Sequence, residues 1–191
     1  MAGRLVLTGV LVLVLALALP AQAAETFDVD PVHSFITFEV THLGVGRAMG
    51  MFNEFGGTVV MDKANPANSS VTITLDPNSV YTKNSNRDDH LRGPDFFNVK
   101  QYPEWKFVST AVELSRGGKY NVTGDLTVKG VTKPVAFEIE LVGEGADAKG
   151  TYRAGWYTRF SIKRSAFGID YMPDGLGDEV LMTVALEAKR R

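Results

Sequence analysis

The residue types of a hydrolytic triad stand close together near the start of the chain, at Asp30, His33 and Ser34. A working triad needs the histidine to reach the serine hydroxyl while the aspartate orients the histidine. Neighbouring side chains of an extended strand point to opposite faces, so His33 and Ser34 cannot make that hydrogen bond there. We therefore predict no catalytic residues and interpret this stretch as a polar turn that enters a strand.

A second histidine lies at the end of an alternating apolar run. His42 shares its parity with Ile36, Phe38 and Val40, which places it on the apolar face of a strand or at the rim of that face. One interpretation is a histidine whose ring is satisfied by a backbone carbonyl. The other is a polar contact for the head group of a ligand.

Arg164 is the other candidate for a polar ligand contact. A guanidinium group suits phosphate, because its planar fork of N–H donors matches the phosphate oxygens. The alternative is structural, an ion pair with Asp178 or Glu179.

Metal and thiol chemistry find little support in the residue pattern. The three histidines are too widely spaced for a short metal motif, and Asp88, Asp89 and His90 are consecutive, so their side chains diverge. The chain has no cysteine, which excludes a disulfide framework, a thiol nucleophile and any Cys-ligated metal. We predict no metal site and no cofactor.

The elements that must position these residues are mostly half-buried strands. From Tyr120 to Val128, and again from Val135 to Leu141, apolar residues alternate with polar ones, which predicts a hairpin with one apolar face. Lys129 to Pro134 is expected to connect the two strands. The same rhythm predicts eight or nine strands, near residues 26–30, 34–42, 56–62, 70–75, 104–114, 119–128, 135–142, 150–163 and 180–188.

Two segments depart from the strand pattern. Around residues 86–98, Asp88 and Asp89 could cap a short helix that Gly93 would end, and such a helix could roof a barrel. Gly44, Gly46 and Gly50 have the wrong spacing for a dinucleotide-binding fingerprint, and we interpret them as a flexible loop. The sequence therefore predicts an all-β fold, a single antiparallel barrel of about eight strands with one short helical segment.

The N-terminus resembles a cleavable export signal. Arg4 precedes an apolar run from Leu5 to Leu19, and Ala21 to Ala23 fit a small-residue cleavage site. The run is shorter than the roughly 20 residues of a spanning helix. We expect residues 1–23 to be a signal peptide, residues 24–191 to form one domain, and the mature protein to be periplasmic or secreted.

The charge balance argues against polyanionic partners. Without Arg4, the 20 basic and 22 acidic side chains become 19 and 22, a formal charge near −3. Nothing in this balance favours nucleic acid, and we expect no stable insertion into a membrane.

Six blocks of sequence, in order, carry a resemblance to a known family. They are residues 30–43 (DPVHSFITFEVTHL), 89–98 (DHLRGPDFFN), 102–107 (YPEWKF), 124–135 (GDLTVKGVTKPV), 164–168 (RSAFG) and 177–180 (GDEV). Together they are similar to the bacterial YceI-like family of exported polyisoprenoid-binding proteins. Trp105 stands where that family more often has an aliphatic residue, and Ala166 where it more often has an acidic one.

The resemblance implies a lipocalin-like barrel whose interior holds a long apolar chain, such as a polyprenyl phosphate or the tail of an isoprenoid quinone. An aromatic-rich lining agrees with this implication, although aromatic residues alone would equally suit an ordinary filled core. The residues expected to contact the ligand are Ile36, Phe38, Val40, His42, Phe97, Trp105, Phe107, Leu126, Phe137, Trp156, Phe160 and Arg164.

Two other classes of function stay open. A ligand-free stress-response or interaction protein would have a filled barrel or a sizeable exposed apolar patch. An enzyme acting on an apolar substrate would need paired titratable groups inside the barrel, and His42 alone is placed there by its parity. A homodimer is also left open.

Overall fold

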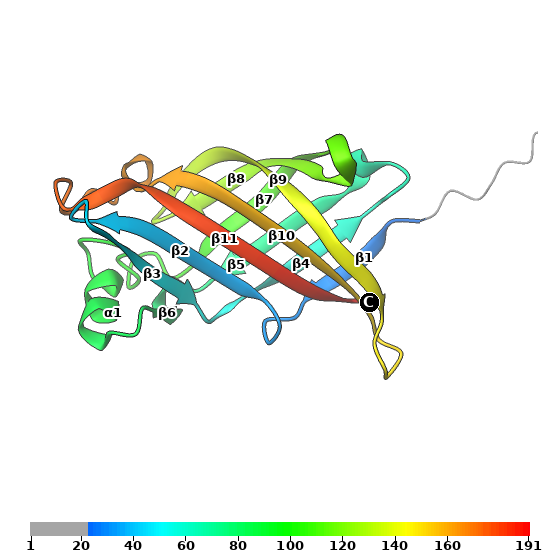
Figure 1. The fold of residues 1–191 in the computed structure, drawn as a ribbon, viewed down its shortest axis with the longest axis horizontal. Coiled ribbons are helices and arrows are strands. Elements are labelled where there is room, and N and C mark those ends of the chain that lie inside the picture. Colours follow the sequence, from blue (N-terminus) through cyan, green and yellow to red (C-terminus); the bar gives the residue numbers. More distant parts are fainter. Residues whose placement is uncertain (1–22) are drawn as a thin grey trace, which may run out of the picture.

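Eight antiparallel strands close into a barrel in the computed structural model, which describes residues 23–191 (Figure 1). Each strand pairs with its neighbour in the ring, and the last pairs with the first. In ring order they are β1 (Glu25–Val29), β4 (Phe55–Met61), β5 (Ser70–Leu75), β7 (Trp105–Leu114), β8 (Tyr120–Val128), β9 (Val131–Ala146), β10 (Tyr152–Lys163) and β11 (Leu176–Arg190). The predicted all-β barrel of about eight strands is confirmed. The expected signal peptide, residues 1–23, lies almost wholly outside the described residues.

Three more strands extend the sheet from the long strand β11. Residues 188–190 of β11 pair with β1, whereas residues 176–185 pair with β2 (Phe35–His42). β2 in turn pairs with β3 (Gly46–Phe52), and β3 with the short β6 (Val80–Tyr81). The barrel therefore continues at one end as a flap of three strands.

The strand β3 corrects the prediction of a flexible loop at Gly44 to Gly50. It pairs with β2 along its whole length, from Ile36 opposite Phe52 to His42 opposite Gly46. Gly50 lies opposite Phe38, and a Cβ atom at Gly50 would stand 2.4 Å from Cζ of the Phe38 ring. The glycine makes room for a neighbouring aromatic side chain inside a regular strand.

The hairpin of β8 and β9 is confirmed, but its connection is shorter than expected. Only Lys129 and Gly130 lie between the strands, both with positive φ (50° and 76°), which is typical of a two-residue type I′ turn. Val131 to Pro134 belong to β9, with Pro134 opposite Asp125. Pro134 is tolerated because the other edge of β9 pairs with β10 only from Glu140 onward, so no partner needs its missing N–H.

The wall of the barrel is split between β9 and β10. Their pairing ends at Tyr157 opposite Glu140, after which the two strands separate. Phe137 and Phe160 stack across this split, with ring centroids 4.5 Å apart and planes 16° apart. Side-chain stacking thus replaces the backbone pairing at this point.

One helix lies beside the flap (Figure 1). α1 (Ser85–Arg92) begins at Asn84, whose side chain accepts a hydrogen bond from the backbone N–H of Arg87, and ends at Gly93. The predicted end is confirmed, whereas the predicted caps Asp88 and Asp89 are wrong, because both lie inside the helix. Four short 3₁₀ turns complete the structure: η1 (Pro66–Asn68), η2 (Pro77–Ser79), η3 (Arg116–Gly118) and η4 (Arg164–Phe167).

Two apolar clusters divide the interior. The first fills the end where the chain termini of the barrel meet, and includes Phe27, Val122 and Trp156. The second lies between the flap, α1 and η4, and includes Phe38, Phe97 and Trp105. No helix among residues 23–191 has the length and apolar character needed to span a membrane.

Candidate lipid-binding cavity

A cavity of about 510 Å³ lies within the second cluster. Its inner wall is made of buried apolar side chains, among them Phe38, Phe97 and Trp105. Exposed residues such as Met49 and Met172 also line it, so the cavity opens to solvent at this end of the barrel. Its volume falls in the range of roughly 300–1,000 Å³ that is usual for small-molecule sites.

Six of the twelve residues that the sequence singled out line this cavity. They are Phe38, Val40, His42, Phe97, Trp105 and Arg164. The other six lie outside the cavity lining. Five belong to the apolar clusters, namely Ile36, Phe107, Leu126, Phe137 and Trp156, and Phe160 stacks on Phe137. Alternation along a strand identifies inward positions, but it cannot tell which of them face empty space and which face packed neighbours.

Tightly packed aromatic rings form the floor of the cavity. Trp105 packs edge-on against Phe97, with centroids 4.8 Å apart, and against Phe52, with centroids 5.4 Å apart. The indole Nε1 of Trp105 is buried and has no hydrogen-bond partner within the described chain. The floor is therefore made of aromatic rings, with one N–H donor among them that is unpaired within residues 23–191.

Arg164 is buried and holds a loop in place. Its side chain donates hydrogen bonds to four backbone carbonyls, those of Ile169 (2.9 Å), Tyr171 (2.8 Å), Leu176 (3.0 Å) and Gly177 (2.9 Å). Two of these carbonyls belong to the segment between η4 and β11 and two to the first residues of β11, a stretch that lines one side of the cavity. The guanidinium group thus fixes the shape of the mouth and has one N–H left.

Neither carboxylate that was considered as a partner of Arg164 forms an ion pair with it in the described chain. Asp178 instead accepts a hydrogen bond from the backbone N–H of Ser165, at 2.9 Å. That bond lowers the pKa of Asp178, and the nearby charges of Lys163 and Arg164 lower it further. Arg164 therefore has a structural role, as the alternative interpretation expected, but it acts through backbone carbonyls and not through carboxylates.

His42 lies at the rim of the cavity, exposed at the end of β2. The rim also contains residues that sequence reasoning missed. His90 on α1 packs edge-on against Phe96 and Tyr171, with ring centroids 5.0 and 5.1 Å away. Its Nε2 lies 2.9 Å from Asp95 Oδ2. This aromatic contact connects α1, the segment after it and the loop held by Arg164.

Arg87 is another lining residue that carries no signal in the sequence. It stands in a short helix of polar residues, where a solvent-facing arginine is the ordinary interpretation. Only the fold brings the first turn of α1, which carries Arg87, to the cavity mouth.

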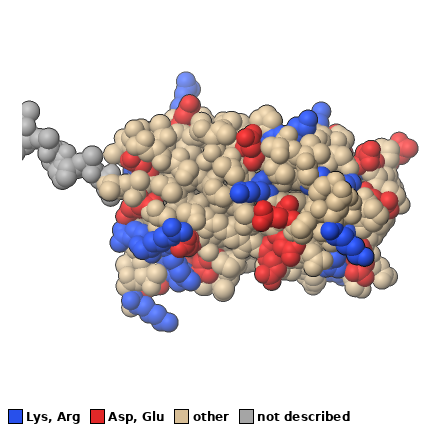
Figure 2. Space-filling view, turned by 180° about the vertical axis from the view of Figure 1, so that it is seen from behind, with Lys and Arg blue, Asp and Glu red and all other residues tan. Residues whose placement is uncertain are grey.

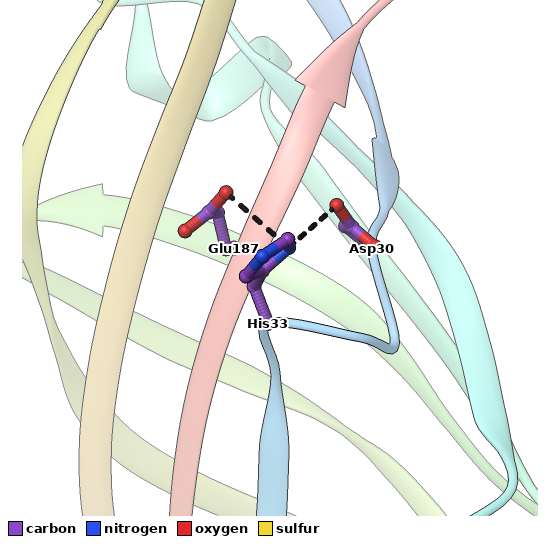
Figure 3. A group of neighbouring side chains, drawn as sticks. All are labelled: Asp30, His33 and Glu187. Carbon is purple, nitrogen blue, oxygen red and sulfur yellow. Dashed lines mark hydrogen bonds and ion pairs between the residues drawn. The ribbon is translucent and has the colours of Figure 1, made fainter. Parts of the chain in front are cut away.

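The supposed triad residues do not line the cavity and lie in a turn between β1 and β2. The hydroxyl of Ser34 donates to the backbone carbonyls of Asp30 (2.8 Å) and Glu187 (3.1 Å), not to His33. His33 Nδ1 lies 3.0 Å from Asp30 Oδ2 and 3.9 Å from Glu187 Oε1 (Figure 3). The interpretation as a polar turn entering a strand is confirmed.

Asp30, His33 and Glu187 also have the side-chain types of a metal site. Their carboxylates are already engaged, however. Arg153 Nη1 donates to Asp30 at 2.9 Å and to Glu187 at 2.6 Å, and Lys189 Nζ lies 2.8 Å from Asp30. A metal ion would have to displace these cations, so we interpret the group as an ion-pair cluster.

The cluster strongly favours the ionised form of Asp30. Its side chain is only 3% exposed, and hydrogen bonds from Lys189, His33 and Arg153 hold its pKa well below the usual range. Arg153 also binds Asp147 through Nε, at 3.0 Å, which lowers the pKa of Asp147. On the face drawn in Figure 2, acidic and basic side chains are interspersed.

The fold is an antiparallel barrel with an apolar cavity that is closed at the packed end and open beside a helix. This architecture is that of a ligand-binding β-barrel protein. The chain belongs to the YceI-like family, because the model of the YceI-like domain matches residues 27–188. A UPF0312 protein of Pectobacterium atrosepticum is 41% identical over 178 residues, covering 93% of this chain and 92% of the relative. Protein YceI of Escherichia coli O157:H7 is 39% identical over 168 residues, 87% of each chain.

Solved structures agree with this assignment. BcnA of Burkholderia cenocepacia superposes with a TM-score of 0.77 at 30% identity, covering 84% of this chain and 99% of that one. A polyisoprenoid binding domain from Saccharophagus degradans, implicated in plant cell wall breakdown, has a TM-score of 0.67 over 86% of this chain and 98% of its own. At 15% identity, that second likeness concerns the fold alone.

Proposed function

We propose that this protein is a carrier that holds one long isoprenoid chain in the barrel cavity. The observation that carries the proposal is the cavity itself, about 510 Å³ with a buried aromatic floor. A ligand-free interaction protein would have no need of an empty interior, since protein interiors are ordinarily close-packed. The polyisoprenoid-binding neighbour of the same fold supports the choice of ligand class.

The energetics of such a complex are favourable. Burying each methylene group is worth about 0.8 kcal/mol, so ten buried carbons would contribute on the order of 8 kcal/mol before the cost of association is subtracted. Of the twelve expected contact residues, the six that line the cavity would meet the ligand directly. The remaining six would contact the ligand only if its chain extended past the aromatic floor into the packed half of the barrel.

Binding without catalysis fits the residues of the wall. Within the described chain, no serine, cysteine, lysine or acidic residue lines the cavity. The hydroxyl of Thr82 does line it, but it already bonds Asp88 and Arg87. These features support a binding protein rather than an enzyme.

We further propose that residues 1–23 are removed and that the carrier works in the periplasm or is secreted. Arg4, the apolar run and the small residues before Ala24 support this part of the proposal. A carrier for water-insoluble lipids would be useful there, because such lipids cannot cross an aqueous space unaided.

Native mass spectrometry of the protein purified from its own periplasm, followed by denaturing lipid extraction, tests both parts. We expect a mass that lacks residues 1–23 and a one-to-one adduct that extracts as a prenyl lipid. An apo protein that also fails to take up added prenyl phosphate, prenyl alcohol or quinone would overturn the carrier function and favour a ligand-free role. A chain that retains residues 1–23 would overturn the cleavage.

A further inference from the structure

The charged side chains around the cavity are all of one sign. Within residues 23–191, Arg47, Arg87 and Arg164 line it together with His42 and His90, and no aspartate or glutamate does. An apolar tail alone would gain nothing from guanidinium groups at the mouth. A lining of this kind suits an occupant that carries negative charge there.

The three arginines differ in how far they are already engaged. Arg47 forms an ion pair with Glu39, and Arg164 spends four of its N–H groups on backbone carbonyls. Arg87 donates two hydrogen bonds, from Nε to the Thr82 hydroxyl (2.7 Å) and from Nη2 to the Thr82 carbonyl (2.6 Å). Three of its five N–H groups remain for a ligand.

The guanidinium of Arg87 is held rather than free. Its partner Thr82 is buried, and the Thr82 hydroxyl donates in turn to Oδ1 of the buried Asp88, at 2.5 Å. The backbone N–H of Thr82 donates to the same oxygen, at 2.9 Å. Asp88 therefore fixes Thr82, and Thr82 fixes Arg87. Within residues 23–191 no salt bridge joins Arg87 to a carboxylate, and Asp88 reaches it only through the Thr82 hydroxyl. The three remaining N–H groups of Arg87 are therefore available to an external anion.

We propose that the mouth of the cavity is a phosphate site, in which Arg87 binds the head group of a prenyl phosphate or diphosphate. The positive charge of Arg164 in the wall adds to the attraction. This inference rests on the proposed carrier function and narrows its ligand from any isoprenoid to an anionic phosphoester. A quinone head offers carbonyl acceptors but no charge, so it would gain less from a preoriented guanidinium.

Ligands that share one tail separate the head group from the chain. We would measure the affinity of the mature protein for a prenyl phosphate, the matching prenyl alcohol and a quinone with the same tail. The phosphate is expected to bind at least about ten-fold more tightly than the alcohol, since charge-assisted hydrogen bonds commonly contribute that much. Its affinity should also fall as salt is added.

Variants assign the effect to Arg87. Arg87→Gln is expected to lose about ten-fold in affinity for the phosphate while its affinity for the alcohol stays unchanged. Arg87→Lys should restore part of the preference, because the charge returns without the planar fork. Arg159→Gln is the matched control, since Arg159 is exposed on β10 and does not line the cavity.

The outcomes distinguish this inference from the carrier function. Equal binding of phosphate and alcohol, or tighter binding of the quinone, would overturn the phosphate site and leave the carrier standing. An equal loss of both ligands in Arg87→Gln would show a merely structural role and overturn the assignment. Inorganic phosphate that binds as tightly as the prenyl phosphate would point to a free anion as the ligand. Failure of all three lipids to bind would overturn the carrier function as well.

Discussion

Trp105 and Phe107 occupy successive inward positions of β7, yet they face different halves of the barrel interior. Trp105 lines the cavity and packs on Phe97, whereas Phe107 belongs to the packed cluster and lies against Phe137, with ring centroids 5.3 Å apart. The boundary between the hollow half and the filled half therefore passes between these two residues. Trp105 is the side chain that limits the depth of the cavity at this strand.

Shortening Trp105 should let the cavity accept a longer chain. In Trp105→Leu we expect affinity to shift toward longer members of a series of prenyl alcohols, at a cost of roughly 1–3 kcal/mol in the free energy of unfolding. Titration of the series against both proteins measures the shift. Phe107→Leu is the control, with a similar loss of stability and no change in length preference. The same length preference in wild type and Trp105→Leu would contradict this role.

Arg164 should act on the loop before β11 more than on the rest of the fold. Arg164→Lys keeps the charge but cannot donate to four carbonyls at once, so we expect the free energy of unfolding to fall by roughly 2–3 kcal/mol. Hydrogen–deuterium exchange should rise in residues 169–177 and stay unchanged in β8 and β9. Arg159→Lys, on the exposed side of β10, should leave both regions unaffected. Uniform loss of protection would indicate global unfolding instead.

The ion-pair cluster at the packed end predicts how stability depends on pH. The pKa of Asp30 is lower in the folded protein than its ordinary value of 3.8. Its stabilising contribution is therefore complete above that value and is lost as the pH falls below it. Asp30→Asn should lower the free energy of unfolding at pH 7 by roughly 2–3 kcal/mol. It should also flatten the acid limb of the curve.

Denaturant unfolding between pH 2 and pH 7 checks this prediction. Asp89→Asn is the control, because the Asp89 carboxylate is 76% exposed and its ion pair with Arg92 lies on the surface. Surface pairs of this kind contribute little. An acid limb in Asp30→Asn that matches the wild type would show that other groups determine it.

Gly50 should control the position of an aromatic ring in the cavity wall. A Cβ atom there would meet the ring of Phe38 at 2.4 Å and Cγ2 of Thr82 at 2.8 Å. We expect Gly50→Ala to displace the ring, to destabilise the fold by roughly 1–3 kcal/mol and to weaken prenyl binding. Gly56→Ala, where nothing lies within 4 Å of the added atom, is the matched control. Unchanged binding in Gly50→Ala would contradict the prediction.

Alternation of apolar and polar residues was enough to predict the barrel. The same reasoning failed where a residue type is explained by a contact with a neighbouring strand and not by the pattern of its own strand. The alternating runs around Phe38, Val122 and Met182 identified their strands correctly. The sequence does not reveal the strand around Gly50, because its glycine makes room for Phe38, a constraint visible only across the sheet. It predicts a longer loop around Lys129 and Gly130, because a proline such as Pro134 usually interrupts a strand.

The cavity was harder to foresee than the strands around it. Parity along the strand places both Trp105 and Phe107 in the barrel interior. Only the packing around them determines which of the two borders the cavity. Arg164 is a candidate from sequence because a guanidinium group suits phosphate. In the structure, however, four of its N–H groups donate to backbone carbonyls. Arg87 had no pattern to mark it, since its place depends on how α1 meets the flap.

The packed cluster behind Trp105 closes the inner end of the cavity, which leaves it as a blind pocket. A chain that enters by its tail must leave in the opposite order, head group first, through the opening by which it came. If the protein carries a lipid as proposed, loading and unloading would both have to take place through this one opening, one after the other. The head group, at the opening, would be the first part of the lipid that an acceptor contacts.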